Sequence, residues 1–284
     1  MKKIMLFILL SSLLLNLSPI IVQADKKLNK ELMKIVNEFK PSNSLIVSPD
    51  KPFPTKSIKL YDFNQDGRKE IIVTFEVKAK EQPSPSQYGA MVLKKVNNKW
   101  EKIWETRIKG VDLDFSGLAD ITGDGTKEYL FGVTIGAALG SKLKIFQWND
   151  NSFKNIAEVL YHEIDILNGN QKEGLAVWRW YLAECSLVDV LKWNGDQLVY
   201  DKELFSKYYP VIEKFYNDKI SKMDAWFYWY CLADAQIKAN LFEEASKSIE
   251  KGSLLAKKLS MPEGVQNFNK LRDRLEEKKK SLKN

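Results

Sequence analysis

Three segments of this 284-residue chain repeat one loop pattern, and each loop runs into an apolar, strand-like segment. Each loop begins with an aspartate and ends with a glutamate eight residues later, and the three loops occupy residues 62–70, 120–128 and 165–173. A repeat of tens of residues decides the architecture, because each unit buries its apolar face only against its neighbours. The chain is therefore predicted to contain about three stacked β units.

The segment after each loop repeats as well. Alternating apolar residues flank short turn-forming segments, each with a tryptophan close to the turn, at Trp100, Trp148 and Trp193. Turn residues between alternating apolar residues predict a β-hairpin. Residues 55–208 are therefore predicted to form an all-β, propeller-like repeat domain of about three four-stranded units.

The first loop has the oxygen spacing that calcium needs. Calcium takes about six to eight oxygen ligands, and a tight loop can supply them from alternate positions with a glycine at the sixth. A complete set of donors is present, namely Asp62, Asn64, Asp66, the Arg68 carbonyl and Glu70. We expect Ca²⁺ to bind here; the alternative is an ordinary turn, since Asp-Gly is a favoured turn pair without any metal.

The second loop supplies a similar set, namely Asp120, Thr122, Asp124, the Thr126 carbonyl and Glu128. A hydroxyl at its third position is a weaker ligand, so weaker Ca²⁺ binding or none is expected. The third loop has Leu167 and Gly169 where oxygens are needed, and it is expected to keep the turn and lose the ion. An earlier register of the second loop, from Asp112 to Asp120, also fits the ligand spacing, but the later register aligns with the other repeats.

This pattern resembles the FG-GAP or VCBS-type repeat of integrin-α-like β-propellers over about residues 41–208. The resemblance implies calcium in loops between blade strands. An EF-hand differs, because it needs an acid at the twelfth position, where this chain has Val73 and Phe131, and flanking helices. Closed propellers usually have about 4–8 blades. Three repeats are expected either to form an incomplete stack completed by flanking segments or to close by self-association.

Residues 1–24 have the layout of a secretory signal. Two lysines precede an apolar run, and small residues stand at the positions that a signal peptidase reads. Cleavage is expected, with an uncleaved membrane anchor as the alternative. The mature protein is then secreted or extracytoplasmic, free or cell-surface associated, with no further membrane span. Residues 25–54 are predicted to hold an amphipathic helix over 26–39 and a linker.

From Pro210 the hydrophobic period changes to 3.6, which predicts a small helical domain over residues 209–284 and an α+β chain overall. Residues 226–259 resemble one tetratricopeptide unit, at the positions of Trp229, Leu232, Ala233, Gln236, Asn240, Phe242, Ala245 and Gly252. A third helix is expected over 263–282. The aromatic run 226–230 is expected to pack between sheet and helices rather than to bind sugars, because exposing it would be unusual.

Composition weighs against catalysis. The single histidine, His162, excludes mechanisms that need two, and no nucleophile elbow or phosphate-binding glycine loop occurs. No catalytic residue is assigned. We expect a non-enzymatic binding or scaffold module for a protein or cell-envelope partner. The alternative is a secreted hydrolase, or an accessory subunit of an extracellular enzyme, that uses acids outside the loops such as Glu163 and Glu184. Cys185 and Cys231 are expected either to form a disulfide or to remain buried thiols.

The formal charge of +7 does not indicate a nucleic-acid partner. Without the two lysines of the signal, the chain has 42 basic and 37 acidic residues, or +5. Residues 261–284 hold seven basic and four acidic residues, which leaves only +2 for the remainder. Net charge points to a polyanionic partner only where it is clustered. No nucleic acid is therefore expected as a partner.

Overall fold

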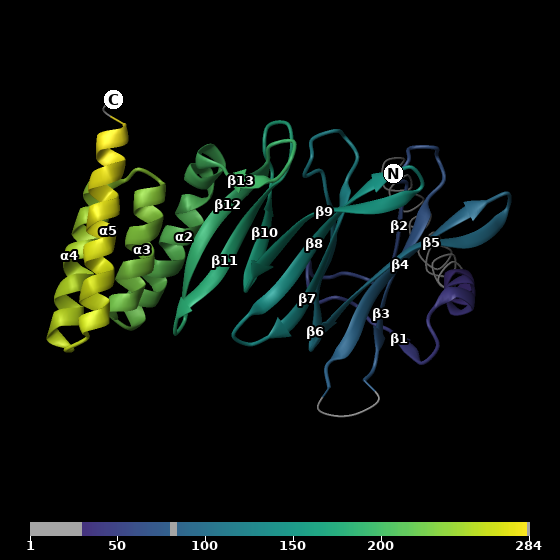
Figure 1. Ribbon diagram of the computed structural model, residues 1–284, viewed down its shortest axis with the longest axis horizontal. Helices are drawn as coiled ribbons and strands as arrows, with labels where there is room; N and C mark the ends of the chain where they lie inside the picture. Colours follow the sequence, from purple (N-terminus) through teal and green to yellow (C-terminus); the bar gives the residue numbers. More distant parts are fainter. Residues whose placement is uncertain (1–29, 80–83, 283–284) are drawn as a thin grey trace, which may run out of the picture.

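The computed structural model describes residues 30–79 and 84–282, and within them three antiparallel sheets are followed by four helices, α2 to α5. The fold is thus α+β, as expected, and Figure 1 shows the sheets and helices in a row along the long axis. The predicted signal, residues 1–24, lies outside the described residues. The sheets do not close into a ring, so a complete propeller is not formed.

Each sheet is built from strands that are consecutive along the chain. The first sheet contains β1 (Ser44–Ile46), β2 (Ile58–Tyr61), β3 (Glu70–Val77), β4 (Ser86–Val96) and β5 (Lys99–Gly110). The second contains β6 (Asp112–Ala119), β7 (Glu128–Gly136), β8 (Gly140–Asn149) and β9 (Ser152–Tyr161). The third contains β10 (Glu163–Leu167), β11 (Gly174–Leu182), β12 (Cys185–Trp193) and β13 (Leu198–Tyr200). The predicted repeat of about four strands with a closing hairpin is therefore confirmed.

The hairpins turn where the sequence places residues that tolerate positive φ. Asn97 and Asn98 have φ of 48° and 64° between β4 and β5, and Asp150 and Asn151 have φ of 44° and 67° between β8 and β9. A two-residue hairpin turn of type I′ requires positive φ at both central residues, for which Asn and Asp are suited. The third hairpin uses Gly195 at φ 111°.

The three sheets pack face to face, and successive residues of one strand enter different cores. On β7, Tyr129 and Phe131 belong to the core shared with the first sheet, whereas Leu130 belongs to the core shared with the third sheet. Side chains along a strand point alternately to its two faces, so a central sheet needs apolar residues at both sets of positions. This explains the nearly continuous apolar run of β7.

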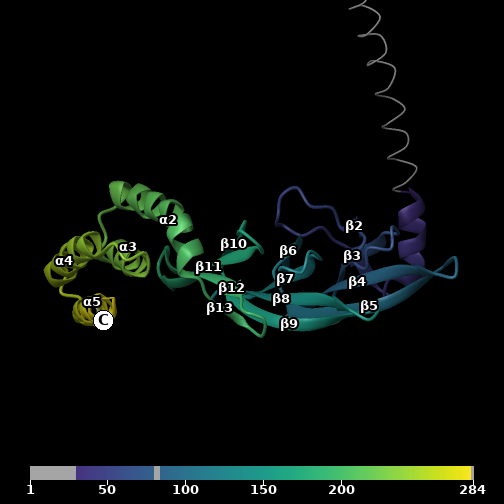
Figure 2. The same ribbon diagram turned by 90° about the horizontal axis from the view of Figure 1, so that it is seen from above.

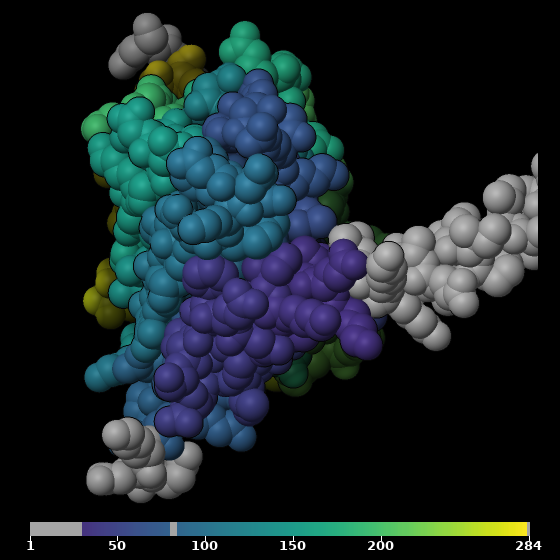
Figure 3. All heavy atoms as spheres, turned by 90° about the vertical axis from the view of Figure 1, so that its right-hand side faces the viewer, coloured from purple at the N-terminus to yellow at the C-terminus, as the bar shows by residue number. Residues whose placement is uncertain are grey.

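Helices cover both end faces of the stack. The described part of the predicted N-terminal helix, residues 30–39, packs Val36 against Ile71, Val73 and Phe75 of the first sheet. Figure 3 shows this end, where the N-terminal residues in purple form the outer layer. At the other end, α2 and α3 cover the third sheet. The flanking segments thus complete the stack in place of further sheets.

The helical region begins earlier than the change in period predicted. Helix α2 (Lys202–Lys222) starts eight residues before Pro210, which lies inside it. Its N-cap, Asp201, accepts the Leu204 amide at 2.7 Å, and Leu204 and Phe205 are buried against the third sheet. The predicted start of the helical domain at residue 209 is therefore too late, because the buried residues of α2 already recur at helical spacing from Leu204 through Tyr208 to Ile212.

The remaining helices agree with the expected helix pair and third helix. They are α3 (Trp226–Lys238), α4 (Phe242–Lys258) and α5 (Pro262–Ser281), and Figure 2 shows them at the end of the row. A Cβ atom on Gly252 would lie 2.2 Å from Phe268 Cζ and 2.8 Å from Trp229 Cβ. Only glycine therefore allows these helices to cross so closely. Among the described residues, no helix is long and apolar enough to cross a bilayer.

The two cysteines join the sheets to the helices. Cys185 of β12 and Cys231 of α3 form a disulfide, with Cα atoms 6.3 Å apart. The aromatic run at the start of α3 packs inside the molecule, as expected, since Trp226 and Tyr228 are buried. Both observations place α3 at the centre of the contact between the third sheet and the helical region.

Candidate metal centre

The first two loops have the same backbone conformation. The first loop connects β2 to β3, and the second connects β6 to β7. The first sheet also contains β1, which precedes β2. The fourth and sixth loop positions have positive φ in both, with 57° and 81° at Gln65 and Gly67 and 79° and 86° at Gly123 and Gly125. Because left-handed residues at fixed positions set the course of a tight turn, the two loops turn in a similar way, although their third side chains have different partners.

One hydrogen bond to the first aspartate is the same in both loops, and the other differs, because Asp120 Oδ1 accepts the Gly123 amide at 2.8 Å. The amide of Gly67 donates to Asp62 Oδ2 at 2.8 Å, and the amide of Gly125 donates to Asp120 Oδ2 at 3.2 Å. Asp62 Oδ1 accepts a second amide, that of Asp66, at 3.2 Å. The first aspartate of each loop thus folds the loop around its own carboxylate.

At the fifth position, too, an aspartate carboxylate accepts an amide hydrogen from its own loop. The amide of Arg68 donates to Asp66 Oδ1 and that of Thr126 donates to Asp124 Oδ1, both at 2.8 Å. Asn64, at the third position, donates its Nδ2 to Asp66 Oδ2 at 2.8 Å. Asp66 is fully exposed, and these hydrogen bonds from Asn64 and Arg68 lower its pKa. The fifth carboxylate is therefore ionised at neutral pH and available at the surface.

The glutamates at the ninth position lie in a different environment. Glu70 and Glu128 begin β3 and β7, and each residue is only 1% exposed. Glu70 Oε2 accepts the Phe63 amide at 3.0 Å, and Glu128 Oε2 accepts the Ile121 amide at 2.8 Å. Burial raises the pKa of both carboxyl groups. They anchor each loop from inside, a role that ligand spacing alone did not predict.

In the second loop, Thr122 turns towards this anchor rather than outwards. Its amide donates to Glu128 Oε2 at 3.0 Å and its Oγ1 donates to Glu128 Oε1 at 2.9 Å. The third position of the second loop is thus engaged by the buried glutamate. The expectation that this loop binds calcium more weakly than the first stays a prediction.

The donor chemistry suits a hard divalent cation, while the described arrangement is held by loop amides. Among the residues that the structure describes, no three His, Cys, Asp or Glu side chains converge into a group that could hold a metal ion. The Asp62 and Asp66 carboxylates already accept amide hydrogens. Binding would have to exchange these hydrogen bonds for ion contacts, which favours weak affinity. The residues therefore fit calcium in type and order, in a loop that must adjust around the ion.

The third loop departs from the predicted register. Asp165 lies within β10, paired with Ala176, and its carboxylate accepts the hydroxyl of Tyr208 on α2. The connection itself spans only residues 168–173, two fewer than in the other units. The alignment that placed Asp165 at the first loop position is wrong, because β10 continues past Asp165 to Leu167. The turn is kept in shorter form.

The earlier register of the second loop does not correspond to a loop. Asp112 and Asp114 lie within strand β6. The later register, beginning at Asp120, corresponds to the actual connection between β6 and β7. The preference for the register that runs directly into a strand is confirmed.

The three loops lie side by side at one end of the stack. Gln65 Nε2 donates to Thr126 Oγ1 at 3.2 Å, which joins the first loop to the second. Glu173 joins the second to the third, because its amide donates to Asp120 O at 2.8 Å and its side chain accepts the Asp120 amide at 2.5 Å. Neighbouring loops are therefore joined by direct polar contacts.

A polar recess of about 510 Å³ opens between these loops and the β8–β9 hairpin. It is lined by Phe63, Asn64, Gln65, Thr126, Trp148, Asn149, Asp150 and Asn151. The sequence predicted only a turn for the hairpin segment. The approach of this hairpin to the loops depends on how adjacent sheets pack, for which the local sequence carries no signal.

The residues considered for catalysis do not form a site. His162 stacks on Trp180 with ring centroids 5.0 Å apart, and its Nδ1 accepts the Trp180 amide at 3.2 Å. Glu163 pairs with Lys51, and Glu184 pairs with Lys219, which lowers the pKa of Glu184. A general acid needs the opposite shift. These contacts describe surface ion pairs rather than an acid pair facing a cleft.

No protein-family model matches this chain, and no curated protein matches it either. The likeness to FG-GAP and VCBS-type repeats therefore stays an expectation carried by the loop motifs. The chain's own loops, their contacts and their chemistry are the basis for a functional assignment.

Proposed function

We propose that this chain is a secreted, calcium-binding repeat protein without enzymatic activity, which serves as a binding or scaffold module for a protein or cell-envelope polymer. The observation that carries the proposal is the pair of loops with one ligand order, one backbone conformation and direct contact with each other. Ordinary turns would not need the same oxygen-rich residues at the same positions in two adjacent sheets, so the repetition favours a shared ligand.

In the first loop, the ion would be held by Asp62, Asn64 and Asp66 together with the Arg68 carbonyl and Glu70. In the second loop, the corresponding donors are Asp120, Thr122, Asp124, the Thr126 carbonyl and Glu128. When bound, Ca²⁺ supplies the positive charge that offsets repulsion among the carboxylates. Ordering of the first loop would also order the wall of the recess, because Asn64 and Gln65 of that wall belong to the first loop.

Lys94 sets a limit on affinity at the first loop. Its Nζ lies 3.9 Å from Glu70 Oε1 and donates to Asn151 Oδ1 at 2.9 Å, so a fixed positive charge already stands beside the loop. A nearby cation opposes the binding of a second one. We therefore expect a dissociation constant of roughly 10⁻⁴–10⁻³ M, the range of extracellular calcium modules.

The test is a thermal unfolding series with increasing calcium. At calcium concentrations about tenfold above the dissociation constant, the free energy of unfolding should rise by about 1.4 kcal/mol per site. Replacing Asp62→Ala together with Asp66→Ala should remove most of the shift. Asp196→Ala, an exposed acid in the β12–β13 hairpin, is the matched control and should respond like the parent. A double variant that keeps the full shift would show that the first loop is not the site.

The binding role is tested separately, by capture of partners from the cell surface with and without a chelator. We expect capture that depends on calcium. A screen for turnover of polysaccharides and peptides addresses the hydrolase alternative, with Glu163→Gln and Glu184→Gln as variants. Turnover by the parent that is lost in either variant would overturn the non-enzymatic assignment.

A further inference from the structure

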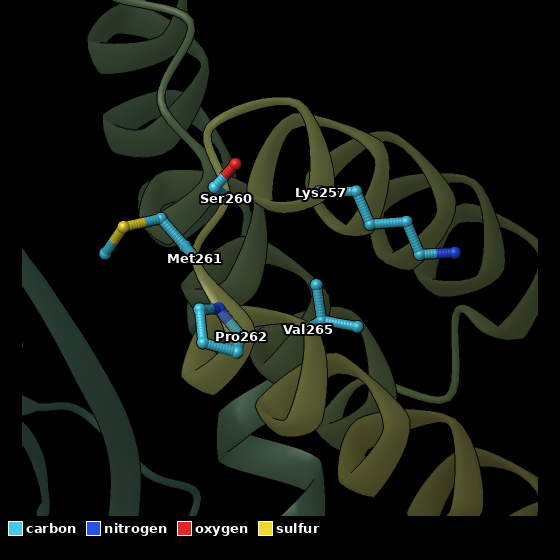
Figure 4. A pocket seen from close by; sticks show the side chains of 5 residues that line it. All are labelled: Lys257, Ser260, Met261, Pro262 and Val265. Atoms are coloured by element: carbon cyan, nitrogen blue, oxygen red, sulfur yellow. The ribbon is translucent and has the colours of Figure 1, made fainter.

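The turn between α4 and α5 exposes apolar side chains that the fold does not bury. Leu254, Leu259 and Met261 are 67%, 58% and 41% exposed. Met261 also lines a shallow depression of about 480 Å³, which Figure 4 shows with its other lining residues Lys257, Ser260, Pro262 and Val265. We call Leu254, Lys257, Lys258, Leu259 and Met261 the α4–α5 patch.

These side chains are not the buried stripe of an amphipathic helix. The buried face of α4 is formed by Ala245, Ile249, Gly252 and Ala256, which pack against α3 and α5. Leu254 lies on the opposite, exposed face, and Leu259 and Met261 lie beyond the helix end. Single exposed apolar residues are common, but Leu254, Leu259 and Met261 are exposed together near one helix end, which favours an interaction surface.

Lysines outnumber acids around the patch. Residues 247–263 contain four lysines and two glutamates, and all six side chains are exposed. Lys257 and Lys258 lie in the last turn of α4 next to the exposed leucines. Apolar side chains beside lysines are the combination that favours an anionic lipid surface, since the lysines meet phosphates while the apolar groups enter the interface.

We infer that the α4–α5 patch docks onto the surface of an anionic phospholipid membrane, with Leu254, Leu259 and Met261 in the interfacial layer and Lys257 and Lys258 against the headgroups. The α4 and α5 helices end the row of elements, far from the N-terminal helix at its other end (Figures 1 and 2), so the patch can meet a flat surface. This contact lies on another surface than the calcium loops and goes beyond the function proposed for them.

The experiment is co-sedimentation of residues 25–284 with vesicles, one set containing equal phosphatidylglycerol and phosphatidylcholine and the other phosphatidylcholine alone. Residues 25–284 are chosen because every described element lies at or beyond residue 30. A chelator is present throughout, so that failure of the calcium proposal and failure of this one are distinguishable. We expect binding to the anionic vesicles and about tenfold weaker binding to the neutral ones.

Two pairs of substitutions locate the contact. Leu259→Glu with Met261→Glu, and separately Lys257→Glu with Lys258→Glu, should each weaken vesicle binding about tenfold. Leu139→Glu, at a residue 60% exposed in the β7–β8 turn, is the matched apolar control. Lys95→Glu with Lys99→Glu in the β4–β5 hairpin is the matched charge control. Both controls should bind like the parent, and thermal unfolding of each variant checks that it is folded.

Three results would overturn the inference. The first is a parent chain that does not sediment with anionic vesicles, or that sediments equally with neutral ones. The second is a control variant that loses as much binding as the patch variants. The third is binding to soluble polyglutamate without binding to vesicles, which would assign the patch to an acidic protein segment. If the charge pair misfolds, Leu254→Glu provides an independent variant of the same surface.

Discussion

The sheet stack and the helical region bury their apolar residues in different ways. In the stack, one strand serves two cores, as Tyr129 and Leu130 of β7 do by facing opposite neighbours. In the helical region, α4 buries a single stripe that includes Ala245 and Ile249. The two regions nevertheless share a core, because Phe205 of α2 packs on the outer face of the third sheet. The helices therefore act as the final layers of the stack.

Removing a buried ring in either region should have the greatest effect on stability. Phe131 of the stack and Phe268 of α5 are fully buried, so Phe131→Ala and Phe268→Ala should each lower the free energy of unfolding by about 3–5 kcal/mol. If the helices are the last layers of one cooperative unit, urea unfolding should show one transition in both variants. Circular dichroism at helix-sensitive and sheet-sensitive wavelengths measures this.

A second transition confined to Phe268→Ala would contradict a single cooperative unit. The helical region would then unfold by itself, and the shared core around Phe205 would not couple it to the sheets. Phe53→Ala, at a residue 91% exposed, is the control and should leave the unfolding curve unchanged.

Much of the sheet architecture could be predicted because its signals are local. Asn97 and Asn98 set one hairpin through their own conformational preference, and the alternation of apolar residues set the strands around it. The start of α2 was missed although its signal is local, since Asp201 caps the helix and Leu204, Tyr208 and Ile212 recur at helical spacing. The change of hydrophobic period at Pro210 predicted the start of the helical pattern there, but this proline lies inside the helix.

In the candidate site, some features could be predicted from neighbouring residues, while others depend on packing against distant parts of the chain. The spacing of Asp62 and Asp66 predicted a loop, and the structure has one between β2 and β3. The burial of Glu70 depends on the packing of the sheets around it, and the shift of Asp165 into β10 depends on strand pairing. Spacing therefore located the loops, but it did not reveal which acids anchor them from inside.

The disulfide tests how firmly the helical region is held to the stack. Cys185 and Cys231 are 46 residues apart, so the chain-entropy estimate for the crosslink is about 4 kcal/mol. Cys185→Ala with Cys231→Ala should lower stability by about 2–4 kcal/mol and loosen the helices more than the sheets. Hydrogen exchange measures this, with faster exchange expected in α3 than in β7. Equal acceleration in both elements would contradict the view that the bond fixes the helical layers to the stack.

Asp234 of the helical region and Lys59 of the stack are charged groups that differ in their partners. In the helical region, Asp234 is compensated by Lys238 at 3.0 Å and Arg274 at 2.6 Å. In the stack, Lys59 of β2 donates to Ser116 of β6, with its Nζ 2.8 Å from Oγ. Within the described part of the chain, no carboxylate lies within ion-pair distance of Lys59. Burial lowers the pKa of Lys59 from 10.5 to about 8.

The lowered pKa of Lys59 predicts that the free energy of unfolding rises with pH. Between about pH 8 and 10.5 the unfolded chain holds a proton on Lys59 that the folded chain has released, so raising the pH favours the folded state. From about pH 8 to 9.5 the gain should be about 1.5 kcal/mol. Buried tyrosines such as Tyr129, whose pKa is raised, act in the opposite direction only above about pH 10.

The measurement is the unfolding temperature of the parent, Lys59→Met and Lys56→Met across about pH 7.5 to 9.5. Lys59→Met removes the buried charge, so it should flatten the rise by about 4 °C relative to the parent, while exposed Lys56→Met should keep it. The difference between parent and variant isolates Lys59 from Lys278, whose pKa is also lowered by burial. Parallel curves for all three proteins would mean that Lys59 is solvated at the interface between the first two sheets.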